Sequence, residues 1–79
     1  MSPITPQNLV RHELIGLNAK VVRTMNRQLE GLVGKVIDET RNTLTLFNGA
    51  KNTIVPKDVV SFNFYLPNGD VVRVDGKRL

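Results

Sequence analysis

Over residues 18–75, apolar side chains recur at every second position, in short segments separated by residues that favour turns. The clearest of these segments is Thr43–Phe47, in which Leu44 and Leu46 alternate with threonines. A period of two places successive side chains on opposite faces of an extended chain, so it predicts half-buried β-strands and not helices. This pattern restricts most of the chain to an all-β fold.

The turn residues divide the alternating region into about six strands, with a turn roughly every eight to twelve residues. Thr40–Asn42 and Asn48-Gly49 are the clearest turn signals between them. Such spacing is typical of antiparallel barrels and sandwiches. Because closure removes exposed sheet edges, we expect a small, strongly bent antiparallel barrel. The predicted strands are residues 19–24, 32–39, 43–47, 51–55, 57–66 and 71–74.

The in-phase apolar residues of these strands predict the core. Phe47 and Tyr65 fall on the opposite phase. A position flanking the core is favoured for Phe47, whereas core flank and exposure for stacking are equal alternatives for Tyr65. The predicted core residues are Leu44, Leu46, Val60, Phe62, Phe64, Val72 and Val74.

The segment before the strands predicts a short N-terminal helix over residues 5–16. Thr5 is a suitable N-cap, and Pro6 occupies the first helical position, where its missing N–H costs nothing. Gly16 can adopt the left-handed conformation that ends a helix. The whole chain is then one domain, residues 1–79, with a polar tail at residues 76–79.

The predicted helix carries apolar side chains in two directions. Leu9 and Leu14 lie on one side at about 100° per residue, and Ile15 lies on the other. A small barrel cannot bury both sides, so we expect Ile15, with Leu9 or Leu14, to contact a protein partner. The alternative is that Ile15 ends the helix and turns into the barrel.

Composition favours binding over catalysis. Eleven Lys and Arg oppose seven Asp and Glu, giving a net charge of +4 and a pI near 10.0, values typical of nucleic-acid-binding domains but also of an ordinary basic surface. The absence of cysteine excludes disulfides and thiolate zinc sites and fits a cytoplasmic location. Neither a signal peptide nor an apolar run of ~18 residues is present, so no membrane association is expected.

Catalytic residues are not expected. His12 is the sole histidine, and Asp38 and Glu39 are adjacent on a predicted strand, so their side chains point to opposite faces. No nucleophile with a base, metal cage or paired carboxylates can be assembled from such residues. We therefore expect no catalytic residue, no metal site and no cofactor bound by this chain.

The candidate RNA site consists of Lys and Arg side chains together with one amide side chain, that of Asn42. Each cation alone is equally an ordinary solvated charge, but together they could follow a phosphate backbone. Arg41 is the strongest candidate, because a hairpin tip lets its planar guanidinium engage phosphate at two points. Its alternative role is a local pair with Asp38 or Glu39. The candidate residues are Lys20, Arg23, Arg27, Arg41, Asn42, Arg73, Lys77 and Arg78.

Three segments resemble one family, archaeal ribonuclease P protein component 1. Residues 8–17 resemble its opening helix, residues 31–44 (GLVGKVIDETRNTL) its most distinctive segment, and residues 62–76 its closing hairpin. The resemblance covers roughly residues 7–79 and implies an Sm-like, SH3-like barrel. It also implies an accessory subunit that binds the catalytic ribonuclease P RNA, while that RNA and its Mg²⁺ remove the 5′ leaders of precursor tRNAs.

The same resemblance implies that the partners are ribonuclease P RNA, the zinc-containing ribonuclease P protein component 4 and other ribonuclease P proteins. Two alternatives stay open at this point. One is an SH3-like ribosomal or translation protein that binds RNA, and the other is a protein–protein adaptor that binds none. The fold alone does not separate these three functions.

Overall fold

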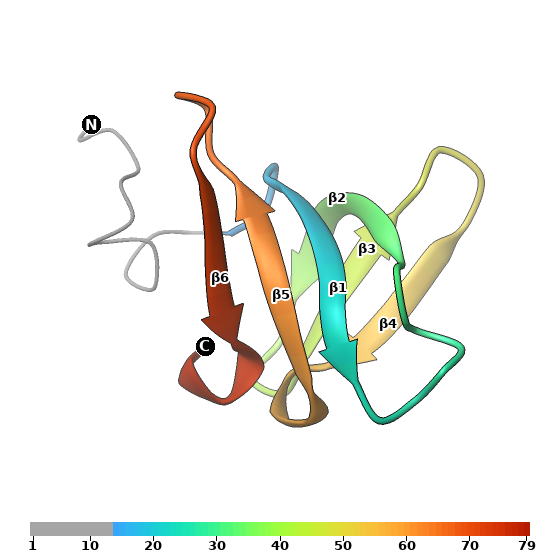
Figure 1. Ribbon diagram of the computed structural model, residues 1–79. Coiled ribbons are helices and arrows are strands. Elements are labelled where there is room, and N and C mark those ends of the chain that lie inside the picture. The colour runs from blue at the N-terminus through green and yellow to red at the C-terminus, as the bar shows by residue number, and fades with distance from the viewer. Residues whose placement is uncertain (1–13) are drawn as a thin grey trace.

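The computed structural model describes residues 14–79, and its regular structure is almost entirely β (Figure 1). Every predicted strand is present, with bounds that differ by at most a few residues. The elements are β1 (Asn18–Thr24), β2 (Val33–Glu39), β3 (Thr43–Phe47), β4 (Asn52–Pro56), the 3-10 helix η2 (Lys57–Val59), β5 (Val60–Tyr65), β6 (Val71–Asp75) and the 3-10 helix η3 (Gly76–Arg78).

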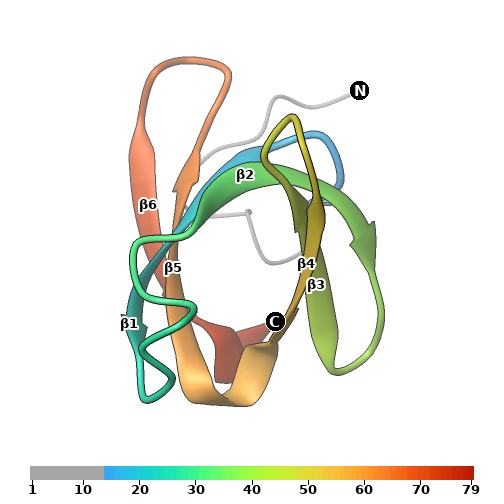
Figure 2. The same cartoon turned by 90° about the vertical axis from the view of Figure 1, so that its right-hand side faces the viewer.

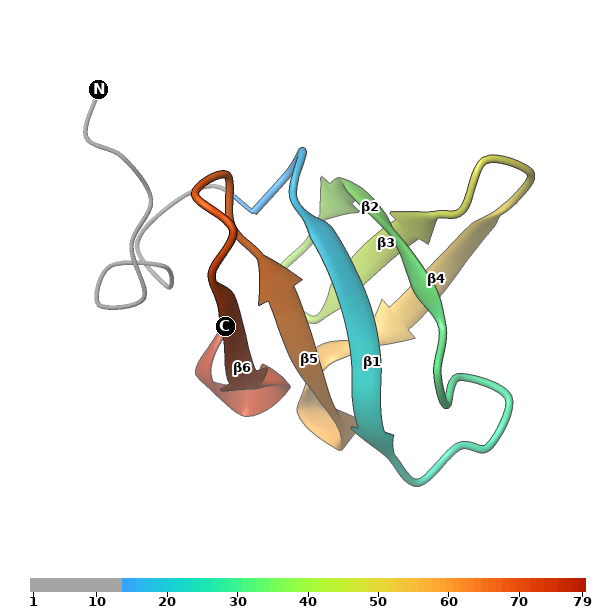
Figure 3. The same cartoon turned by 45° about the horizontal axis from the view of Figure 1, so that its top comes forward.

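The strands form one antiparallel sheet in the order β4-β3-β2-β1-β5-β6. The all-β prediction is confirmed, but the prediction of a closed, strongly bent barrel is wrong, because β4 and β6 are not paired and the sheet is open. Pro56 ends β4 without a backbone N–H, and the chain then turns into η2 instead of continuing along a partner strand. Figure 3 shows the two edge strands apart from each other.

The two halves of the sheet face each other in Figure 2, and the buried apolar residues form a single core. Of the predicted core residues only Val72 is not fully buried, and it packs at the margin of the core. The rings of Phe62 and Phe64 lie at its centre, with their centroids 5.5 Å apart. Phe47 and Tyr65 are 39% and 37% exposed, on the outer face. Buried apolar side chains beyond the predicted set are Leu14, Leu17, Ala19, Val21, Leu29, Val36, Val55 and Leu66.

Both ends of the described chain differ from expectation. Residues 5–13 of the predicted helix lie outside the described residues, and its last part is a turn in which the Leu17 amide donates to the Leu14 carbonyl at 3.1 Å. Leu14 is buried in the core and Ile15 is exposed, so Ile15 is the one of the two that lies open to a partner. Within residues 76–79, predicted as a polar tail, Gly76–Arg78 form η3 and Leu79 packs against the core.

Two register shifts set which side chains of β1 and β2 face outward. One lies between Val21 and Arg23 and the other between Val36 and Asp38. The extra residue in β1 keeps Val21 opposite Phe62 in the core and places Arg23 opposite Ser61. Glycine is required at position 34 of β2, because a Cβ there would lie 2.8 Å from the backbone oxygen of Phe47.

Candidate nucleic-acid interface

Lys20 and Arg73 share one outward row of the sheet. Lys20 on β1 is opposite Asn63 on β5, and Asn63 is in turn opposite Arg73 on β6. Directly opposed residues of antiparallel strands project from the same face, so the two cations flank the Asn63 amide at about two strand spacings, ~10 Å. This face therefore presents a cation, an amide and a second cation in a line.

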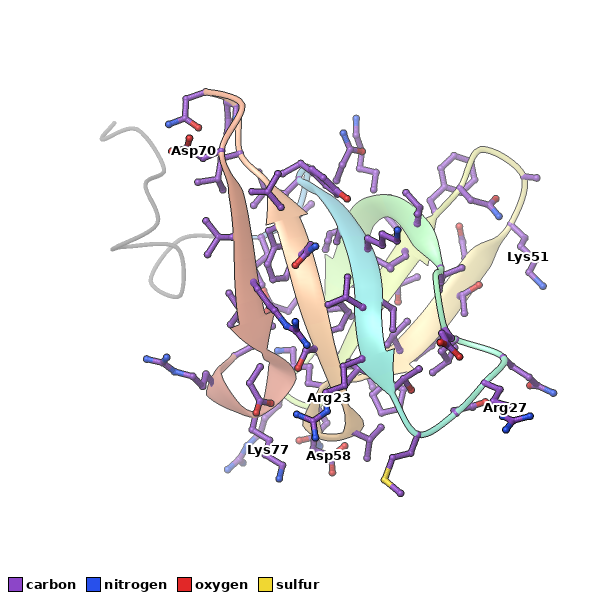
Figure 4. The ribbon with its side chains drawn as sticks, viewed as in Figure 1. Arg23, Arg27, Lys51, Asp58, Asp70 and Lys77 are labelled. Atoms are coloured by element: carbon purple, nitrogen blue, oxygen red, sulfur yellow. The ribbon has the colours of Figure 1, made fainter. Side chains whose placement is uncertain are left out.

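Arg23 at the end of β1 and Lys77 on η3 lie at the same end of the molecule. Both line a shallow depression of about 450 Å³ between β1, η2 and η3. Asp58 and Asp75 also line it, so its local charge is balanced. Figure 4 shows Arg23, Asp58 and Lys77 gathered at this end of the molecule.

A second depression, of about 340 Å³, brings together residues that are far apart in the sequence. Arg41 and Asn42 reach it from the β2–β3 turn, and Lys77 reaches it from η3. Asp58 lines this depression as well as the first, so the two lie on either side of η2. Three predicted site residues thus line one depression, although Lys77 is far from Arg41 and Asn42 in the sequence.

Lys57 is a residue of this region that the sequence reasoning missed. Although a lysine, it is only 5% exposed, and its Nζ donates to Glu39 Oε2 at 2.8 Å and to the Thr40 carbonyl at 2.7 Å. Its backbone amide donates to the Asn42 carbonyl at 2.8 Å. One signal could have revealed it: Lys57 lies two residues after the buried Val55, on the inward phase, where a charge needs a partner.

The side chain of Arg41 is free of the local pairing that was its alternative role. The one ion pair within residues 14–79 joins Lys57 to Glu39, which leaves neither Glu39 nor Asp38 bound to Arg41. Arg41 is exposed at the turn beside the second depression. Its guanidinium can therefore meet an external anion without first breaking an internal contact.

The remaining candidates are not brought into either depression. Arg27 lies in the β1–β2 connection, and Figure 4 shows it projecting away from the end that carries Arg23 and Lys77. Arg78 is exposed on η3 but lines neither depression. Leu9 and His12 lie outside the described residues.

Within the described part of the chain, His, Cys, Asp and Glu form no group of three or more that could hold a metal ion. The same part contains no helix long and apolar enough to cross a membrane. The geometry thus offers an outward cationic surface supported by a β-sheet. A fold and a surface of this kind define the class of small basic β-sheet proteins.

Comparison with known proteins specifies the family. The family model described as "Ribonuclease P/MRP, subunit p29" matches residues 7–79. The chain belongs to this family, and it is a protein subunit of ribonuclease P with a role in precursor-tRNA processing. The ribosomal and adaptor alternatives are thereby set aside.

Relatives and a solved structure agree with this assignment. Ribonuclease P protein component 1 of Methanothermobacter thermautotrophicus is 44% identical over 77 residues, covering 96% of this chain and 83% of the relative. That of Methanocaldococcus jannaschii is 47% identical, covering 96% and 80%. The structure of Mth11, described as a homologue of the human RNase P protein Rpp29, matches with a TM-score of 0.67 at 43% identity, covering 84% of this chain and 86% of that one.

Proposed function

We propose that this subunit binds ribonuclease P RNA through the cations of its outer face and of the two depressions beside η2, and that it takes no part in bond cleavage. The observation that carries the proposal is the convergence of Arg41, Asn42 and Lys77 on one depression from two distant parts of the chain. Hydrolysis is left to the RNA and its Mg²⁺, and this chain binds no metal or cofactor of its own. The cytoplasmic location expected from the sequence stays a prediction.

Electrostatic attraction to phosphates supplies most of the affinity in this proposal. The chain carries a net charge of +4, and its one tyrosine and three phenylalanines form no stacking stripe, since Phe62 and Phe64 are buried in the core. Reading of bases by stacked rings is therefore a minor contribution. Binding should weaken steeply as salt rises, because each phosphate contact releases condensed counterions.

Replacing Arg41 tests this proposal most directly. Arg41→Ala is expected to weaken binding of ribonuclease P RNA and to lower the slope of log K against log[salt] by about 0.7–0.9, the contribution of one phosphate contact. Arg41→Lys keeps the charge but loses the two-point geometry, so its affinity should fall between those of Ala and the original residue. Filter binding or anisotropy across a salt series measures both quantities.

Lys51→Ala is the matched control, because it removes one exposed cation from the β3–β4 turn, far from Arg23 and Lys77 in Figure 4. Its affinity should change less than that of Arg41→Ala. Equal affinity and slope for the original chain and both Arg41 variants, all of them folded, would remove Arg41 from the interface.

Ile15 is the proposed contact for the zinc-containing component 4. It is 44% exposed at the beginning of the described chain, whereas its neighbour Leu14 is buried. Ile15→Asp is expected to abolish or strongly weaken heterodimer formation in a pull-down, since a carboxylate would be desolvated at an apolar contact. Val59→Asp is the control, at a comparably exposed apolar residue on η2. An intact heterodimer with Ile15→Asp would show that the partner binds elsewhere.

A further inference from the structure

Thr40 and Thr43 close the β2–β3 turn by hydrogen bonds between themselves, and Lys57 joins this turn to η2. Lys57 donates its backbone amide to the Asn42 carbonyl and its ammonium to the Thr40 carbonyl and to Glu39 Oε2, at 2.7 to 2.8 Å. Two of these hydrogen bonds reach the turn on either side of Arg41, and the third reaches Glu39 at the end of β2. The bonds from Lys57 therefore fix the orientation of this turn relative to η2.

The backbone of Lys57 also lies against η3. A Cβ placed on Gly76 would lie 1.8 Å from the Lys57 carbonyl oxygen and 2.8 Å from that of Val60, so the backbones of η2 and η3 are in direct contact. Lys77 follows Gly76, and its amide donates to Asp75 Oδ1 at 3.0 Å, which holds the beginning of η3. Lys57 therefore lies between the two segments that carry Arg41 and Lys77.

We infer that the depression lined by Arg41, Asn42 and Lys77 is a single subsite for one RNA phosphodiester and its ribose, and that Lys57 is the positioning residue that assembles it. The inference rests on the proposed RNA-binding function. Arg41 and Lys77 supply charge from two sides, and Asn42 supplies an amide for a ribose hydroxyl. Lys57 itself touches no RNA, because it is buried and its ammonium is already bonded to Glu39 and Thr40.

Lys57→Met tests this role, with Lys51→Met as the matched control for the loss of one positive charge. Lys57→Met should weaken binding of ribonuclease P RNA roughly tenfold, the effect of one lost charge-assisted contact. Lys51→Met should weaken it by about twofold or less, since an exposed charge far from the subsite is screened. Hydrogen exchange at the backbone amide of residue 57 should also accelerate, reporting the loosened turn without any RNA.

A second comparison separates positioning from a general structural effect. If Lys57 acts by placing Arg41, then Lys57→Met should cost little further affinity in an Arg41→Ala background, because the contact it supports is already gone. If Lys57→Met reduced RNA affinity as much in the Arg41→Ala background as in the original chain, the inference would be overturned. Equal losses of RNA affinity for Lys57→Met and Lys51→Met would also overturn the inference. If Arg41→Ala still weakened binding in that case, the proposed RNA-binding function would stand. If the original chain binds no ribonuclease P RNA, the proposed function itself fails.

Glu39→Ala keeps the test decisive if Lys57→Met does not fold. Removing this carboxylate deletes one of the three bonds to Lys57 and also removes a negative charge. Charge alone predicts tighter RNA binding, whereas a loosened turn predicts weaker binding. Asp38→Ala, which removes the neighbouring exposed carboxylate, should bind RNA as tightly as the original chain or more so. Tighter binding with both variants would contradict the role given to Lys57.

Discussion

Phe64→Ala is expected to lower the free energy of unfolding by about 3–5 kcal/mol, enough to leave much of a domain this small unfolded. Phe64 is completely buried on β5, beside the ring of Phe62. It lies opposite Ala19 on β1 and opposite Val72 on β6, so truncation would leave a cavity at the junction of three strands. The loss combines the missing apolar burial with the cavity that remains.

Urea unfolding followed by circular dichroism measures this effect, and Phe47→Ala is the matched control. The same substitution there removes a ring that is 39% exposed on the outer face of β3, so it should cost clearly less. An equal midpoint for Phe64→Ala and the original chain would contradict the core described above.

Gly76→Ala is expected to cost roughly 3 kcal/mol, at the upper end for overpacking, because the obstacle is backbone and not a flexible side chain. The new methyl would overlap the Lys57 carbonyl oxygen and force η3 away from η2. Since Lys77 and Arg78 are carried by η3, RNA affinity should fall together with stability.

Gly69→Ala provides the comparison. Gly69 has a positive φ of 94°, but a Cβ at this position would have no atom within 4 Å, so the cost is backbone strain of about 1 kcal/mol. Thermal unfolding should therefore rank the original chain first, Gly69→Ala second and Gly76→Ala last. RNA binding should be reduced in Gly76→Ala alone, and a Gly76→Ala chain with unchanged melting would show that η2 and η3 do not pack as described.

The strands could be predicted from the sequence because their signals are local. The alternation of Leu44 and Leu46 with threonines, and of Phe62 and Phe64 with polar residues, reports which side of each strand is buried. Gly49 adopts the positive φ that the Asn48-Gly49 turn signal implies. Each of these features depends on a few neighbouring residues.

The open edges of the sheet could not be predicted, because they depend on distant parts of the chain. Closure would have required β4 to pair with β6, but Pro56 and η2 redirect the chain before that pairing can form. The residues that follow β6 looked like a tail, and only their contact with Lys57 shows that Gly76 is a packing residue.

The sequence could predict several residues of the candidate site, but not how they are arranged in space. Arg41, Asn42 and Lys77 were selected for charge, hydrogen-bonding capacity and turn position, and the structure brings them to one depression. Arg27 had the same charge signal but lies away from it. Lys57 was missed because a lysine after a proline resembles any exposed loop residue, whereas its burial depends on Glu39 and Thr40 in another strand and turn.

The position of β1 in the middle of the sheet bears on how quickly the protein reaches its native state. This strand pairs with β2, which follows it closely, but also with β5, where Asn18 is opposite Tyr65 near the other end of the chain. Pairings of such long sequence separation must close large loops before they contribute stability, so folding belongs on the millisecond-to-second scale and not the microsecond scale of helical bundles. During synthesis β1 leaves the ribosome well before β5, and its second edge stays open to wrong partners until β5 has been made.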